Sequence, residues 1–148
     1  MLKLAFNTLG ICGAAGFSGV MLCIGVTLGG YWRSLPAQEF LDWFAANNGY
    51  VARSVPVIVL PTLIGLVGSL WLSWGSDAFL FWCLSAACFL AVLILTVAYF
   101  VPSNTAFAGG MVDASQVEAK LGAWLRLHNL RIATAMLGAV FAVVATAK

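Results

Sequence analysis

The residues best suited to chemistry lie where the last apolar segment of the chain begins. The stretch from Trp124 to Arg131 contains the only histidine, His128. Steps of three and four residues place side chains on one face of a helix, so Trp124, His128 and Arg131 share one stripe. The same spacing continues in both directions through Val117, Leu121, Ala135 and Gly138. Imidazole changes charge near neutral pH and suits proton transfer, whereas an arginine in a membrane is costly unless it is paired or solvated.

Two interpretations of this stripe stay open. In the first, His128 and Arg131 line a polar pocket and hold a ligand. In the second, Arg131 extends to lipid phosphate and His128 caps a loop carbonyl. The combination of Trp124, His128 and Arg131 on one face favours the pocket.

Two further clusters of polar residues lie at the ends of apolar segments. Thr96 and Tyr99 are three residues apart, which predicts a shared helical face, and Asn104 follows closely after Pro102. An asparagine supplies donors and an acceptor, although its ordinary role after a proline is in a turn. The other group contains Arg53, next to an Asn-Gly pair at residues 48–49 that is typical of a turn.

The segments that carry these residues are apolar and long. Of 148 residues, 63% are hydrophobic and only 8% are charged, whereas a soluble domain has roughly 25% charged residues. A span needs about 20 apolar residues, and four segments qualify, near residues 4–30, 55–74, 79–101 and 130–147. We therefore expect an all-α integral membrane four-helix bundle that forms a single domain over residues 1–148.

The sequence also predicts the structure of the segments that connect the four spans. Residues 36–44 suit a short interfacial helix between the first two spans, or a helix folded back onto the bundle. Pro102 should end the third helix. Ser115 and Glu118 fit a capping box that starts an amphipathic extension, about residues 116–129, leading into the fourth span. The first span is rich in Gly and Ala, which favours close helix packing.

With four spans, both termini and the Asp77 loop lie on one side. The two long loops and their flanks carry most of the basic residues, so the positive-inside rule places them in the cytoplasm, and we expect a bacterial inner membrane. This topology brings six polar residues to one end of the bundle: Arg53, Tyr99, Asn104, His128, Asn129 and Arg131.

Several function classes are disfavoured by the sequence. A single histidine and four cysteines within apolar segments offer no metal-ligand spacing, so we expect no metal site. None of the common hydrolase, metalloprotease or nucleotide-binding motifs occurs. No span contains an acidic residue, which argues against a proton pump. The net charge of +2 gives no reason to expect nucleic acid binding.

The motifs resemble those of a family of small four-span membrane proteins that includes the fungal anthrone oxygenases. The features are the Gly- and Ala-rich first span, the Pro-x-Asn at Pro102 and Asn104, and Trp124 followed by His128 (or Asn129) and Arg131. The resemblance would cover nearly the whole chain. It implies a four-helix bundle that oxidises anthrones to anthraquinones without a classical cofactor, so we expect none.

In the chemistry that this resemblance suggests, His128 is the base that removes an acidic C–H. Arg131 or Asn104 stabilises the enolate oxygen, and Trp124 and Tyr99 stack on a flat quinone- or anthrone-like ring. Asn129 and Arg53 complete the predicted ligand-binding set. The alternative is a non-enzymatic accessory protein, in which the arginines hold lipid headgroups and the first span binds a partner helix or a second copy.

Overall fold

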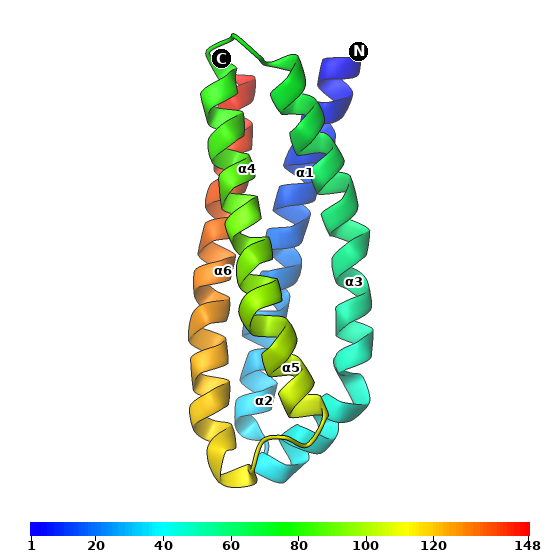
Figure 1. Cartoon of the computed structure of the whole chain (residues 1–148), viewed down its shortest axis with the longest axis vertical. Helices are drawn as coiled ribbons and strands as arrows, with labels where there is room; N and C mark the ends of the chain where they lie inside the picture. Colours follow the sequence, from blue (N-terminus) through cyan, green and yellow to red (C-terminus); the bar gives the residue numbers. More distant parts are fainter.

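The structure, a computed structural model of residues 1–148, consists of four long helical rods that lie side by side (Figure 1). The first rod is α1 (Leu2–Cys23), a π-helical turn η1 (Ile24–Leu28) and α2 (Gly29–Ser34), and the second is α3 (Ala37–Leu72). The third is α4 (Ala78–Leu95), a second π-helical turn η2 (Thr96–Phe100) and α5 (Val101–Ala108). The fourth is a 3₁₀ turn η3 (Ala114–Gln116) followed by α6 (Val117–Thr146).

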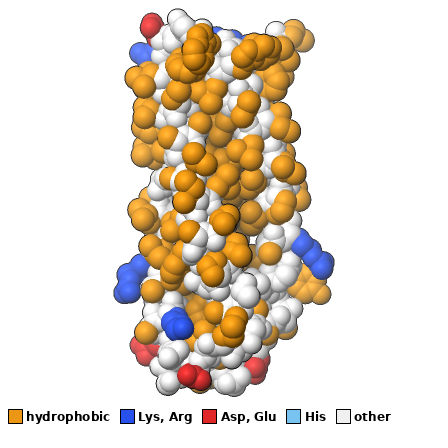
Figure 2. Space-filling view, in the orientation of Figure 1, with side chains coloured by type: hydrophobic (Ala, Val, Ile, Leu, Met, Phe, Trp, Pro, Cys, Tyr) orange, Lys and Arg blue, Asp and Glu red, His pale blue; other side chains and the backbone are white.

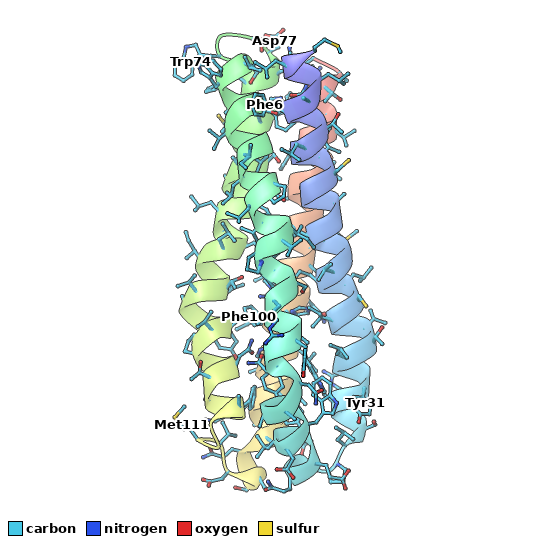
Figure 3. All side chains as sticks on the ribbon, turned by 90° about the vertical axis from the view of Figure 1, so that its right-hand side faces the viewer. Phe6, Tyr31, Trp74, Asp77, Phe100 and Met111 are labelled. Atoms are coloured by element: carbon cyan, nitrogen blue, oxygen red, sulfur yellow. The ribbon has the colours of Figure 1, made fainter.

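All four rods are long and apolar enough to cross a membrane. On the face shown in Figure 2, hydrophobic side chains predominate in the middle, and charged side chains lie toward the two ends. The chain termini lie at the same end of the bundle as the loop at Asp77 (Figures 1 and 3). The predicted integral membrane four-helix bundle is therefore confirmed.

Glycines bring α1 and α3 into direct backbone contact. A Cβ placed on Gly65 would lie 2.6 Å from the Cα of Gly10, and one on Gly13 would lie 2.9 Å from the Cα of Thr62. Real Cβ atoms do not approach other atoms so closely, so neither glycine can be replaced without moving the helices apart. The Gly-rich face of α1 thus packs inside the bundle, as small residues do between membrane helices.

No separate interfacial helix forms between the first two spans. Instead, α3 begins at Ala37 and runs without a break to Leu72, so residues 36–44 are its first turns. Phe40 and Phe44 are almost fully buried against the other rods, and burial of these aromatic rings draws the helix onto the bundle. The prediction of an in-plane helix was wrong, and the fold-back alternative describes the structure.

Two predicted helix boundaries also differ from the structure. Pro102 does not end the third helix, because it lies in the first turn of α5, where a missing N–H is tolerated, directly after the π-helical turn η2. The capping box at Ser115 does not form. The residue that caps α6 is Gln116, without a side-chain hydrogen bond, and the η3 turn forms the start of this rod.

Candidate functional site

The predicted stripe on α6 faces the interior of the bundle. All seven of its members are buried: Val117, Leu121, Trp124, His128, Arg131, Ala135 and Gly138. The α-helix is continuous through this region, so residues spaced by three and four positions lie on the same face. The only histidine and an arginine therefore lie in the protein core.

His128 is fully buried, and both of its ring nitrogens are engaged. Its Nδ1 lies 2.7 Å from Nη2 of Arg131, and its Nε2 lies 2.8 Å from the carbonyl oxygen of Met21 on α1. A guanidinium only donates and a carbonyl only accepts, so Nδ1 accepts and Nε2–H donates. These partners assign His128 as the neutral Nε2–H tautomer, with no lone pair left free on the ring.

The imidazole is also held by close packing. The Trp124 ring stacks on it at a centroid distance of 4.7 Å and an interplanar angle of 13°. A Cβ on Gly25, in η1, would lie 3.0 Å from Cδ2 of His128, so a side chain there would press on the ring and force it to shift. Trp124 is itself anchored, because its Nε1–H donates to Oδ1 of Asn104 over 2.9 Å.

Arg131 is a buried cation whose side-chain partners are uncharged. Its guanidinium carbon lies 3.7 Å from the centre of the Phe100 ring, and Nη1 donates to Oγ1 of Thr96 over 3.3 Å. The Thr96 hydroxyl donates in turn to the carbonyl of Val92, which leaves its oxygen to accept from the arginine. Nε of Arg131 has no hydrogen-bond partner. A buried charge without a counter-ion is costly in the low-dielectric core of a membrane bundle.

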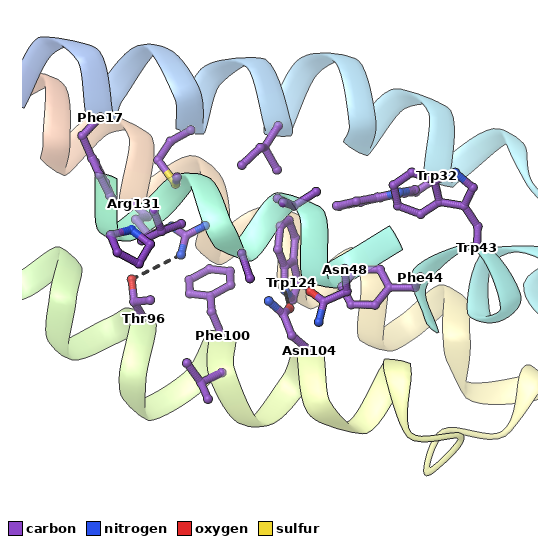
Figure 4. A pocket seen from close by; sticks show the side chains of 17 residues that line it. Phe17, Trp32, Trp43, Phe44, Asn48, Thr96, Phe100, Asn104, Trp124 and Arg131 are labelled. Atoms are coloured by element: carbon purple, nitrogen blue, oxygen red, sulfur yellow. Dashed lines mark hydrogen bonds between the residues drawn. The ribbon is translucent and has the colours of Figure 1, made fainter. Parts of the chain in front are cut away.

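A cavity of about 220 Å³ lies beside this cation (Figure 4). Arg131, Thr96, Asn48 and Asn104 supply its polar lining, while His128 is not part of the wall and lies behind Arg131. The remaining walls are mostly apolar, with six aromatic residues: Phe17, Trp32, Trp43, Phe44, Phe100 and Trp124. Such an apolar cavity with few polar groups is typical of a small-molecule site.

Exposed residues at the rim give the cavity a route to the outer surface. Ala52 and Pro56 of α3 line the cavity and are exposed, and Val101 of α5 lines it with 53% of its surface exposed. The opening therefore lies on the side of the bundle, between α3 and α5.

The structure brings together only part of the predicted set. Arg131, Asn104 and Trp124 line the cavity, with His128 directly behind. Asn129 is exposed, because it follows His128 by one position and a helix turns about 100° per residue. Arg53 is also exposed and lies over the ring of Tyr50, outside the cavity.

Tyr99 does not reach the cavity either. It lines a separate pocket together with Pro102 and Lys120. The π-helical turn η2 has a wider repeat than an α-helix, so Thr96 is followed on the inner face by Phe100 and not by Tyr99. Phe100 thus takes the aromatic position predicted for Tyr99.

Asn48 is a cavity residue that the sequence reasoning missed. The Asn-Gly pair suggested a turn, but α3 passes through it as a regular helix. The available signal was spacing, because Phe44, Asn48, Val51 and Val55 follow steps of four, three and four and all line the cavity.

The fold and the site define an integral membrane four-helix bundle with a buried Arg–His pair beside an aromatic cavity. The family model of the anthrone oxygenases matches residues 40–141, more than half of the chain, and the chain belongs to this family. No curated protein and no solved structure matches it. Met21 and Gly25, which contact His128 from the first rod, precede the matched region.

Proposed function

We propose that this protein binds a flat, apolar ring compound with its oxygen against Arg131 and oxidises an anthrone-like CH₂ group to a carbonyl. The observation that carries the proposal is the buried guanidinium beside an aromatic cavity, with only uncharged protein partners. A ligand oxygen with negative charge supplies the partner that the chain lacks. Membership of the anthrone oxygenase family supports the choice of ring compound.

The chemistry needs an anion-stabilising group more than any other. An anthrone carries an acidic CH₂ opposite its carbonyl, and loss of one proton gives an enolate whose charge lies largely on oxygen. A fixed guanidinium in an apolar cavity stabilises that oxygen strongly. The enolate then reacts with O₂. In the net reaction one oxygen atom becomes the new carbonyl, and the other leaves as water with both hydrogens of the CH₂ group.

The protein residues divide into those that face the ligand and those that position them. Arg131 faces the ligand oxygen, and the rings of Trp124 and Phe100 form the walls on which a flat molecule stacks. His128 accepts from Nη2 of Arg131 and donates to Met21, so it fixes the direction of the guanidinium. It becomes available as a base only after Arg131 leaves its Nδ1.

A turnover experiment in nanodiscs tests this proposal. The wild-type protein should convert anthrone to anthraquinone with matching O₂ uptake. Arg131→Met should reduce turnover by at least about a hundredfold, the scale for losing one oxyanion-stabilising group. Arg126→Met, an exposed arginine on the same helix, is the matched control and should leave the rate unchanged. Equal rates for Arg131→Met and the wild type, or no anthrone oxidation above the uncatalysed rate, would refute the proposal.

The accessory-protein alternative required Arg53 and Arg131 to hold a lipid phosphate. Arg53 is exposed and Arg131 is only 6% exposed, so they do not form a joint site. We further propose a bacterial inner membrane with the cavity end toward the cytoplasm, because Arg33, Lys120 and Arg126 lie at that end.

A further inference from the structure

We infer that Asn48 and Asn104 form a second oxygen-binding site at the end of the cavity away from Arg131. We call these two residues the amide pair. On this inference, which rests on the proposed function, the cavity recognises a ring system with acceptor oxygens on two opposite edges. Figure 4 shows the amide pair near Trp124, with Phe100 between it and the Arg131–Thr96 contact.

The orientation of the Asn104 amide follows from its partner. Trp124 Nε1–H can only donate, so the atom of Asn104 that faces it is the carbonyl oxygen Oδ1. This contact leaves the NH₂ group of Asn104 without a partner in the chain. Asn104 lines the cavity, so it offers donors to a ligand.

The side-chain amide of Asn48 has no hydrogen-bond partner in the chain, unlike that of Asn47. Nδ2 of Asn47 donates to the carbonyl of Trp43 over 2.8 Å, which completes a contact within α3. The Asn48 amide makes no such contact and lines the same cavity as Asn104. A polar group left without a partner beside apolar walls is unfavourable, and a ligand oxygen would satisfy it.

Donors at both ends of the cavity specify the ligand. Arg131 can only donate, Asn104 has only its NH₂ group free, and Asn48 adds the two N–H groups of its own amide, so both ends can donate to an acceptor oxygen. A quinone presents two carbonyl oxygens, which can only accept, on opposite edges of one ring. Anthrone has an oxygen on one edge only. The amide pair therefore binds the second oxygen, the one that the proposed reaction introduces.

Anaerobic binding of two probes, anthrone and 9,10-anthraquinone, tests this inference. Quenching of tryptophan fluorescence reports binding, because three tryptophans line the cavity: Trp32, Trp43 and Trp124. All proteins carry Trp71→Phe and Trp74→Phe, since these exposed rings would report ligand dissolved in the micelle. This parent protein should bind anthraquinone about tenfold more tightly than anthrone, as one net hydrogen bond predicts.

Asn48→Leu should lower the affinity for anthraquinone about tenfold and leave the affinity for anthrone unchanged. Asn47→Leu is the matched control and should leave both affinities unchanged. Asn48→Ala, which adds no bulk, should give the same ratio if Asn48→Leu fails to fold. An unchanged anthraquinone affinity in the Asn48 variants, or an equal loss for both probes, overturns the amide pair while the proposed function stands. Failure of the parent protein to bind either probe overturns the proposed function itself.

Discussion

The role of His128 can be decided by comparing two substitutions, of which only one keeps a hydrogen-bond acceptor for Arg131. Asn places its Oδ1 two bonds from Cβ, where the Nδ1 of His128 lies, so His128→Asn keeps an acceptor for Nη2 of Arg131. His128→Leu keeps the bulk and removes the acceptor. Neither replacement can act as a base near neutral pH.

The structure gives the expected loss of stability for each variant. His128→Leu removes the bond from Arg131, worth about 1.5–3 kcal/mol because the donor is charged, and the bond to Met21, worth about 1 kcal/mol. It also removes the stack on Trp124, worth about 0.5–1.5 kcal/mol. The free energy of unfolding should therefore fall by about 3–5.5 kcal/mol for His128→Leu, and by about 2 kcal/mol for His128→Asn.

Turnover separates the positioning role from the base role. If His128 positions Arg131, His128→Asn should keep turnover within about tenfold of the wild type, whereas His128→Leu should lose about a hundredfold because the guanidinium is misplaced. Rates are measured by O₂ uptake with anthrone in nanodiscs, and stability by unfolding in mixed micelles with sodium dodecyl sulfate. A loss of a hundredfold or more in both variants, the scale for a missing general base, would show that the positioning role is wrong.

Two glycines provide further tests of the packing, each with a matched control. Gly65→Ala places a Cβ against the backbone of Gly10 and should lower the free energy of unfolding by about 3 kcal/mol, whereas Gly16→Ala, with open space around it, should change it by less than about 0.5 kcal/mol. Equal stability of these two variants would contradict the α1–α3 contact. Gly25→Ala presses on the imidazole and should reduce turnover about tenfold, whereas the control Gly30→Ala should not. Wild-type turnover in Gly25→Ala would mean that the exact position of the His128 ring does not matter for the reaction.

Local geometry explains why the α6 stripe could be predicted from the sequence. A side chain's direction in a regular α-helix depends only on residue spacing, so Trp124, His128 and Arg131 were assigned to one buried face correctly. The four spans followed equally directly from the lengths of their apolar segments. Neither inference required knowledge of how the rods pack.

Residue spacing does not encode contacts between separate helices, and these contacts account for the residues that were misplaced or missed. The partner of His128 is a backbone carbonyl, that of Met21, and any residue type can supply a carbonyl. The Asn-Gly pair at residues 48–49 favours a turn locally, but tertiary burial of Phe40 and Phe44 keeps this region helical. Packing of the aromatic side chains thus outweighs the local preference of Asn-Gly for a turn.

The two π-helical turns both lie against the buried Arg131–His128 pair. η1 supplies Gly25 beside His128, and η2 supplies Thr96 and Phe100 beside Arg131, so both departures from α-helical geometry contact the same buried pair. A π-helical turn adds a residue to the helical repeat and shifts the inward face of everything that follows. In η2 this shift gives the inner position to Phe100, whose ring lies under the guanidinium. The cation is thus held by a ring, a hydroxyl and a neutral imidazole, none of which carries a negative charge, and in the proposed function the ligand oxygen supplies that charge.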